Sequence, residues 1–123
     1  MDDKMEKINL FEKFSKFTEH WEPRVIAEMN NYQFKLVRIK GDFIWHNHPD
    51  TDETFIVIQG KMKIKFKNSI VEIGEGEMII VPKGVIHKPI AKDECLVMLV
   101  EPRGVVNTGE KVSDYTAAND VWI

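Results

Sequence analysis

The feature that most constrains the fold of this chain is a succession of short apolar or alternating segments between residues 24 and 100. The clearest segment covers residues 61–67, where lysines alternate strictly with Met62, Ile64 and Phe66. Successive side chains of a strand point to opposite faces, so this alternation predicts a strand that is buried on one side only. Many short strands separated by Gly, Pro, Asn and Asp are typical of an antiparallel sandwich or barrel. We therefore expect an all-β fold.

The same criteria give the expected strands and the direction of their side chains. We expect strands over residues 24–29, 32–39, 43–48, 53–59, 61–67, 71–73, 78–81, 86–90 and 96–100. In the third of these, alternation places Phe43 and Trp45 on the outside of the barrel. The last strand is apolar on both faces, and we favour the interpretation in which Met98 faces inward while Val97 and Leu99 face outward.

Residues 9–22 carry the only helical pattern in the chain. Apolar side chains recur there at spacings of three and four, at Leu10, Phe11, Phe14, Phe17 and Trp21. Asn9 followed by Glu12 predicts a capped start, and Pro23 predicts the end. We expect this helix to pack across a sheet, with His20 near its end as a capping or packing residue.

The length of 123 residues suits a single domain over residues 1–123. Within it we expect the N-terminal helix at about residues 9–22, a barrel at about residues 24–106, and a C-terminal tail at about residues 107–123. Seventeen Lys and Arg against twenty Asp and Glu give a net charge of −3, without a basic stripe, so we expect no nucleic-acid partner.

Apolar runs and cysteine content indicate where the protein works. No apolar run approaches the ~20 residues that a membrane-spanning helix needs, so we expect no membrane partner. The N-terminal residues lack the apolar core of a secretory signal. A single cysteine, Cys95, excludes an internal disulfide and suits a reducing compartment, so we expect a cytoplasmic protein.

Three histidines and one glutamate are spaced so that they could meet at one point. On a strand, His46 and His48 would project from the same side, and a hairpin would bring Glu53 back beside His48. His87 follows the turn at residues 82–84, from which a further strand could deliver it to the same place. Neutral imidazoles and one carboxylate suit transition metals, and an octahedral ion would keep two positions open. An H-x-H pair alone is also typical of surface or core histidines without metal.

The wider spacing of these residues resembles the two motifs of the cupin family. Residues 41–60, GDFIWHNHPDTDETFIVIQG, resemble the first motif: a glycine, H-x-H, three or four residues, Glu, six residues and Gly. Residues 76–87, GEMIIVPKGVIH, resemble the second: Gly, five residues, Pro-x-Gly, two residues and His. Two details depart from the pattern: four residues instead of five separate Gly41 from His46, and Ala91 replaces a usual Asn.

The resemblance implies a double-stranded β-helix, or jelly-roll, cupin barrel. It places His46, His48, Glu53 and His87 on the metal-ligand positions of the family. It further implies a divalent transition metal (Fe, Mn, Zn, Ni, Co or Cu), a small-molecule ligand or substrate, and a homodimer. Two functions stay open: a metal-dependent enzyme, either an oxygenase or an isomerase or lyase acting on a small oxygenated metabolite, and a non-catalytic module that binds or senses a metal or small ligand. No separate catalytic side chain and no organic-cofactor motif stands out.

Overall fold

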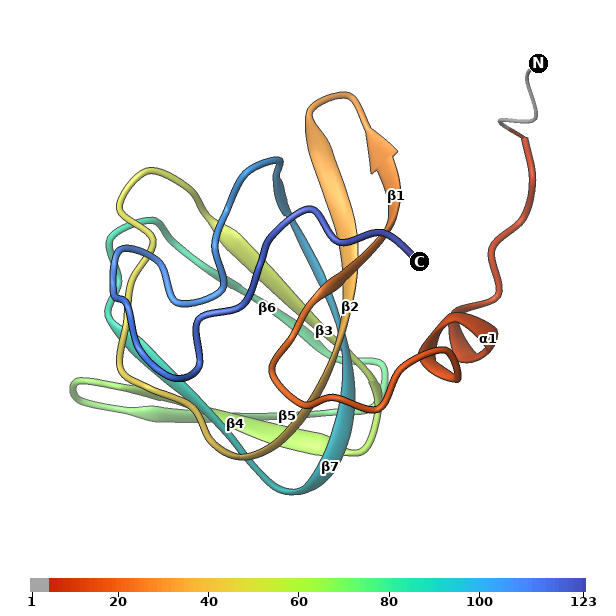
Figure 1. Cartoon of the computed structure of the whole chain (residues 1–123). Coiled ribbons are helices and arrows are strands. Elements are labelled where there is room, and N and C mark those ends of the chain that lie inside the picture. The colour runs from red at the N-terminus through yellow and green to blue at the C-terminus, as the bar shows by residue number, and fades with distance from the viewer. Residues whose placement is uncertain (1–4) are drawn as a thin grey trace.

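The computed structural model describes residues 5–123 and is built mostly from antiparallel strands that close into a barrel (Figure 1). Hydrogen-bonded neighbours follow the order β1-β2-β7-β3-β6, and β4 pairs with both β5 and β7. In chain order the elements are α1 (Leu10–Phe14), β1 (Arg24–Met29), β2 (Tyr32–Asp42), β3 (Glu53–Gln59), β4 (Lys61–Phe66), β5 (Ile70–Gly74), β6 (Met78–Val81) and β7 (His87–Pro102). The expected all-β fold is confirmed.

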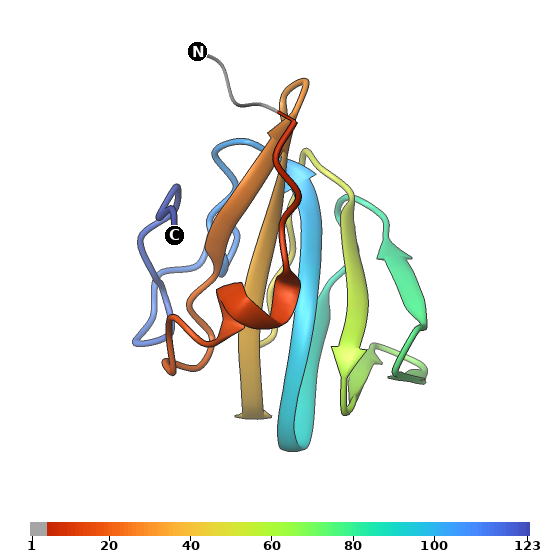
Figure 2. The same ribbon diagram turned by 90° about the vertical axis from the view of Figure 1, so that its right-hand side faces the viewer.

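Strand β7 is the longest element and joins the two halves of the barrel. Its first residues pair with β4, and its last residues lie between β2 and β3 (Figure 2). Two separate strands were expected here, over 86–90 and 96–100, but the chain stays extended through the exposed charged residues 92–94 between them. No glycine or proline interrupts that stretch, so the strand can bend around the end of the barrel without breaking.

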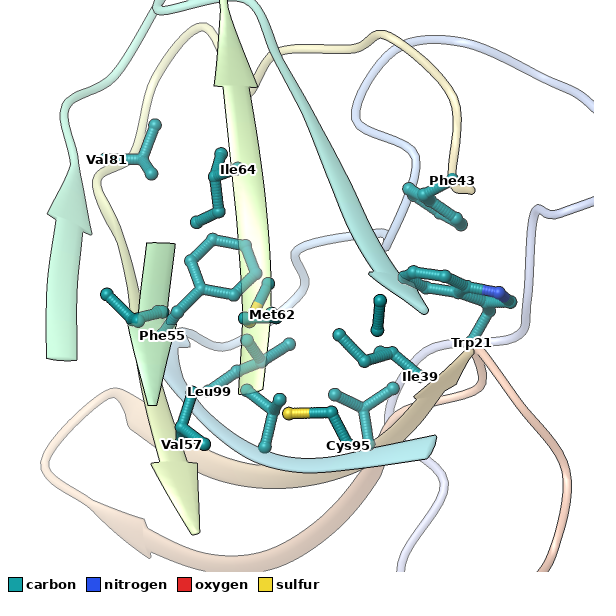
Figure 3. Packing of buried hydrophobic residues seen from close by; sticks show 14 residues of the cluster. Trp21, Ile39, Phe43, Phe55, Val57, Met62, Ile64, Val81, Cys95 and Leu99 are labelled. Atoms are coloured by element: carbon teal, nitrogen blue, oxygen red, sulfur yellow. The ribbon is translucent and has the colours of Figure 1, made fainter. Parts of the chain in front are cut away.

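The segment that contains the H-x-H pair is not the strand that alternation predicts. Beyond Gly41, at a φ of 84°, the chain leaves β2, and residues 43–52 form only an isolated bridge between His46 and His87. The His46 amide donates to the His87 carbonyl at 3.0 Å, and the His87 amide donates back at 2.9 Å. Because the segment is a loop, Phe43 does not point outward as predicted: it is buried and stacks on Trp21 (Figure 3).

Helix α1 spans five residues instead of the expected residues 9–22. The predicted start is confirmed, because the Glu12 amide donates to the Asn9 side chain at 3.0 Å. The early end has a tertiary cause: the Arg38 guanidinium on β2 donates to the carbonyls of Phe14 and Phe17, both at 2.9 Å. In a continuing helix each of these carbonyls would accept a hydrogen bond from the amide four residues later, whereas the Phe14 carbonyl here accepts from the Phe17 amide, three residues later, at 3.4 Å.

The segment after α1 runs on in irregular conformation. Trp21 adopts a positive φ of 68°, which a helix does not allow. His20 neither caps nor packs as expected, since its Nε2 lies 2.8 Å from Glu94 Oε2 at the surface. The apolar side chains still find partners, because α1 and the following residues cover the outer face of the sheet (Figure 2). This outer cluster contains Phe14, Phe17, Ile26, Leu36 and Leu96.

The main core fills the inside of the barrel (Figure 3). Val97 and Leu99 of β7 point into it, whereas Leu96 and Met98 pack with the outer cluster. The expectation that Met98 faces inward is therefore wrong. Both faces of this strand are apolar because the N-terminal segment covers the outer one, so no polar residue marks the outside.

The tail after β7 lies against the barrel. The Val25 amide of β1 donates to the Val121 carbonyl at 2.7 Å, and the Ile123 amide donates to the Val25 carbonyl at 3.2 Å. The Asn107 side chain donates to the carbonyls of Trp21 and Tyr115, at 3.0 and 2.8 Å. Within residues 5–123 there is no helix of the length and apolarity required to cross a membrane.

Candidate metal centre

The four residues singled out in the sequence meet inside the barrel. His46, His48, Glu53 and His87 each offer one ligand atom, and these atoms all lie within 4.8 Å of one another. Glu53 Oε1 is 3.4 Å from His48 Nε2 and 3.5 Å from His87 Nε2. The convergence follows from the spacing of the two motifs, although the H-x-H pair comes from a loop. Their role as metal ligands stays a prediction.

Hydrogen bonds of the backbone hold the two contributing segments together. Glu53 opens β3 and His87 opens β7, and the bridge between His46 and His87 brings the H-x-H loop to the same place. The Gly84 amide donates to the His48 carbonyl at 2.9 Å, which ties the turn before His87 to the H-x-H loop. Gly84 has a φ of 81°, a conformation that residues with a side chain rarely adopt.

The C-terminal tail supports the same loop from outside. Gly109 has a φ of 65°, and a Cβ atom there would collide with the Asn47 carbonyl oxygen. The same Cβ would lie 3.6 Å from His48 Nδ1. Only a glycine permits this close approach of two backbones, so the tail packs directly against the residue between the two histidines.

All four side chains are buried, with exposed fractions of 1–5%. Three of their polar atoms have no hydrogen-bond partner within residues 5–123: His48 Nε2, Glu53 Oε1 and His87 Nε2. A buried polar atom without a partner costs about 1–3 kcal/mol, so three of them together require an explanation. They face the same point, and a cation there would satisfy all three. The residues present therefore fit a metal ion.

The ring orientation of two histidines suits metal binding. His46 Nδ1 lies 2.9 Å from the Ile44 carbonyl, and His87 Nδ1 lies 2.9 Å from the Val85 carbonyl. A carbonyl only accepts hydrogen bonds, so Nδ1 is the donor in each ring, which leaves Nε2 as the ring nitrogen that can bind a metal ion. Fixing the tautomer through the other ring nitrogen is how proteins usually orient histidine ligands.

Burial also sets the charges of the cluster. Burial, and then the neighbouring His87, lower the pKa of His46 from 6.5 to about 4, so this imidazole is neutral at pH 7. Burial alone would raise the pKa of Glu53, but the imidazoles of His48 and His87 hold it well below its usual range. The cluster thus offers a neutral nitrogen donor in His46 and a carboxylate in Glu53.

A small cavity adjoins the cluster at His46 and Glu53. Its volume of about 30 Å³ holds roughly one or two water molecules. The other walls are mostly apolar and come from Trp21, Pro23, Val37, Ile39, Phe43, Phe55, Pro89 and Leu99, with Asn107 of the tail. A larger open groove, of about 860 Å³, is lined by residues of β4, β5 and the bend of β7 and shares no residue with the cluster.

Two charged residues that lie beside the cluster were not identified from the sequence. Lys35 on β2 and Glu101 near the end of β7 are both buried, and Lys35 Nζ lies 2.6 Å from Glu101 Oε2. Burial, and then the negative charge of Glu53, raise the pKa of Glu101. A signal was present, because strand alternation puts Lys35 on the same face as the core residues Val37 and Ile39.

Comparison with known proteins places the chain among relatives of the same fold. The family described as Cupin domain matches residues 35–101. A crystal structure of a cupin-2 domain containing protein from Shewanella frigidimarina is 57% identical, with a TM-score of 0.77, over 78% of this chain and 94% of that one. The jelly-roll barrel that the motifs implied is thereby confirmed.

Other similar proteins are more distant. The uncharacterized protein YdbB of Bacillus subtilis is 36% identical over 64 residues, which are 51% of this chain and 57% of that protein. The match thus spans little more than half of that curated relative. Hydroquinone 1,2-dioxygenase PnpCD, solved with Cd²⁺ and 4-hydroxybenzonitrile, is 18% identical with a TM-score of 0.67, over 78% of this chain and 72% of that one. At that identity the likeness shows the fold alone.

Proposed function

This chain belongs to the cupin domain family, and from that premise we propose that it binds a divalent transition metal and acts as an enzyme on a small oxygenated metabolite. The proposal rests on three buried atoms that lie close together and have no hydrogen-bond partner within residues 5–123. They are His48 Nε2, Glu53 Oε1 and His87 Nε2. Three imidazoles and one carboxylate suit Fe, Mn, Zn, Ni, Co or Cu.

Each residue of the cluster has a defined part in this proposal. His46, His48 and His87 would hold the ion as neutral donors, and Glu53 would contribute one negative charge. A bound divalent ion supplies Lewis acidity, and a redox-active ion can also exchange electrons. One carboxylate against a divalent ion leaves the site positive, which favours a substrate with an oxygen anion or a polar carbonyl.

The surroundings of the cluster favour a small substrate. The adjoining cavity is small, and Trp21 and Phe43 stack with ring centroids 4.7 Å apart along its wall. The tail closes the same region, because Tyr115 lies against Phe43 at 5.3 Å between centroids. These apolar surroundings strengthen electrostatic interactions between a bound molecule and the buried cluster. We therefore expect a compact substrate whose apolar part contacts the aromatic wall.

A non-catalytic binding or sensing module is the alternative. The observation in its favour is the lining of the cavity, where only His46 and Glu53 titrate, and both belong to the proposed ligand set. No independent acid or base therefore stands at that wall to move a proton. Turnover with oxygen uptake would support an oxygenase, and turnover without oxygen an isomerase or lyase. Binding of a small molecule without turnover would support the module.

The metal proposal has a direct test. The His46→Ala/His48→Ala variant removes two of the four proposed ligands, so we expect purified, untagged protein to lose its bound metal in elemental analysis. His20→Ala is the matched control, because His20 lies at the surface outside the cluster. It should retain the metal content of the original chain. Unchanged metal in the double variant would overturn the assignment.

Two further features belong to the proposal. We propose a homodimer, supported by exposed apolar side chains of the edge strand β6, Met78 and Ile80. A reducing compartment, the cytoplasm, is proposed because Cys95 is a free, fully buried thiol. Burial raises the pKa of Cys95 to about 11, so the thiol stays protonated and unreactive at pH 7.

A further inference from the structure

The cavity beside the proposed metal centre is too small for the substrate that such a centre would serve. Its volume of about 30 Å³ holds one or two water molecules. Ligand pockets in proteins typically measure about 300–1,000 Å³. A metabolite with several carbon atoms therefore has no room in the structure as it stands, and part of the cavity wall has to move before one can bind.

Most of the cavity wall is fixed to the barrel. Four apolar lining residues lie on strands β2, β3 and β7, which pair with one another: Val37, Ile39, Phe55 and Leu99. Trp21 lies outside the strands, but its amide donates to the Arg38 carbonyl at 2.8 Å and its indole Nε1 to the Lys40 carbonyl at 3.0 Å. The Phe43 amide donates to the Pro89 carbonyl at 2.9 Å. The part of the wall that remains is the C-terminal tail.

The tail reaches the cavity through a compact loop, residues 107–117, which we call the tail loop. The Asn107 side chain ties its two ends together, since it donates to the Tyr115 carbonyl at 2.8 Å and accepts from the Ala117 amide at 3.0 Å. Inside the loop, the buried hydroxyl of Thr108 donates to a carbonyl of the same loop at 2.7 Å. Surface loops that are closed and packed in this way are often functional. The tail loop can move without losing its own hydrogen bonds.

The tail loop has few attachments to the barrel. Within residues 5–123, a single hydrogen bond joins the two, from the Asn107 side chain to the Trp21 carbonyl at 3.0 Å. The Tyr115 ring adds apolar contacts, with its centroid 5.3 Å from that of Phe43 and 6.5 Å from that of Trp21. Both of these aromatic partners line the cavity. The tail loop therefore covers the wall from outside and is held there weakly.

The segments on either side of the tail loop are anchored. Before it, Lys35 Nζ donates to the Val105 carbonyl at 3.2 Å. After it, the Val25 amide donates to the Val121 carbonyl at 2.7 Å. Between these anchors most side chains are exposed, and Val112 is exposed to 91%. A segment with few buried contacts between two fixed ends is the kind that opens locally while the rest of the protein stays folded.

We propose that the tail loop is a lid over the candidate metal centre, which Asn107 and Tyr115 hold closed and which opens to admit an ion or a small molecule. This inference deepens the proposed function and rests on it for the nature of the ligand. Opening breaks one hydrogen bond and one aromatic contact, and it withdraws Asn107 from the cavity. It also uncovers the backbone beside His48, because Gly109 leaves with the loop. The competing explanation is a fixed cover that leaves the barrel only when the whole protein unfolds.

The first test follows the exchange of Co²⁺, the probe ion, through its visible absorption. Tyr115→Ala removes the aromatic contact, so the lid should open more often. Uptake by the metal-free protein and release to excess EDTA should then accelerate by the same factor, roughly 2- to 10-fold. The dissociation constant should stay unchanged, because the tail loop contains none of the four proposed ligands.

Further variants make the comparison specific. Tyr115→Phe keeps the ring and should retain the original rates. Asn107→Ala removes the hydrogen bond to the barrel and should accelerate both rates roughly 2- to 10-fold, so the test does not depend on one variant. Tyr32→Ala is the matched control, since Tyr32 is the other tyrosine of the chain and is exposed to 44%, against 41% for Tyr115. It should leave both rates unchanged.

Chemical modification of the metal-free protein gives a second readout that does not need metal binding. The buried imidazoles of His46, His48 and His87 react with diethyl pyrocarbonate only when the lid opens, so their modification, mapped by mass spectrometry, should accelerate in Tyr115→Ala and Asn107→Ala. Cys95 reports on unfolding, because its thiol is fully buried in the main core. Its reaction with DTNB should accelerate much less than the modification of the histidines.

The outcomes separate this inference from the proposed function. Failure of the unaltered protein to bind Co²⁺ would overturn the proposed metal binding, while the histidine modification would still decide whether the tail loop is a lid. Equal histidine rates in the unaltered protein and both folded variants would overturn the lid. Equal acceleration at Cys95 and the histidines would also overturn it, because the exposure would come from unfolding. So would a raised Co²⁺ dissociation constant with unchanged uptake, since the tail loop would then hold His48 without controlling access.

Discussion

At the scale of single residues, the site depends on which ring nitrogen of each histidine is free. His46 and His87 come from separate segments, yet both place Nδ1 against the carbonyl two residues earlier. The same local contact therefore leaves Nε2 of both rings free to face the cluster. His48 lacks this bond and is instead backed by Gly109 of the tail. His48 is thus held by other means than the two remaining imidazoles.

The lowered pKa of His46 predicts that the metal-free protein loses stability in acid. The unfolded chain takes up a proton near pH 6.5, whereas folded His46 resists it until about pH 4. Between these values the unfolded state binds more protons, so the free energy of unfolding falls as the pH falls, by up to roughly 3 kcal/mol. Urea denaturation of chelator-treated protein at about pH 7 and about pH 5 measures this loss.

His46→Asn removes the titrating group and should flatten the dependence on pH. His20→Asn, which changes an exposed histidine outside the cluster, serves as the control in the same denaturation series. An undiminished slope in His46→Asn would assign the acid sensitivity to other groups.

At the scale of elements, the N-terminal segment shows how one side chain can end a helix. The apolar residues of the segment 9–22 have helical spacing. Arg38, however, donates hydrogen bonds to the carbonyls of Phe14 and Phe17, and its guanidinium lies over both aromatic rings. Glu94 pairs with the same guanidinium at 2.9 Å. The segment is therefore attached to β2 and β7 as an irregular covering of the outer sheet face.

Arg38→Met should release this covering. Two carbonyls lose a charged donor, which we expect to cost about 2–4 kcal/mol of the free energy of unfolding. Amide hydrogen exchange of residues 10–21 should accelerate, because their attachment to β2 is lost. Arg103→Met is the control, since Arg103 pairs with Glu28 at a more exposed site and should lower the free energy of unfolding much less. Equal losses in the two variants would contradict the proposed attachment.

At the scale of the whole molecule, one part of the outer sheet face stays uncovered. Met78 and Ile80 of the edge strand β6 are exposed, and the strand register places Ile56 beside Met78 and Met98 beside Ile56. The N-terminal segment covers the β2 side of this apolar row but leaves the β6 side open. A large exposed apolar area on a folded protein usually marks an interaction surface.

The proposed homodimer predicts that a charge on this face separates the subunits. Ile80→Lys should shift the mass measured by light scattering from two chains to one, because an unpaired charge would be buried at the interface. Ile70→Lys, at an equally exposed isoleucine of β5 outside this row, should leave the mass unchanged. A monomeric mass for the unaltered protein at high concentration would count against the dimer.

Much of this protein follows from local sequence patterns. Alternation in residues 61–67 and turn residues between short apolar runs predict the antiparallel strands, because side-chain direction in a strand depends only on position along it. The spacing of His46, His48, Glu53 and His87 predicts their meeting. The prediction holds even though residues 43–52 form a loop. The order and spacing of the two motifs together restrict where the four side chains can lie, whether or not the first motif forms a strand.

Other features were decided only by tertiary structure, because they depend on partners far apart in the chain. The helix ends where Arg38 reaches it, and Leu99 faces inward because the N-terminal segment covers the other side of β7. Lys35 and Glu101, 66 positions apart, meet only when β2 and β7 pair. Periodicity states which residues share a face, but long-range packing decides which face is buried and which charges it encloses.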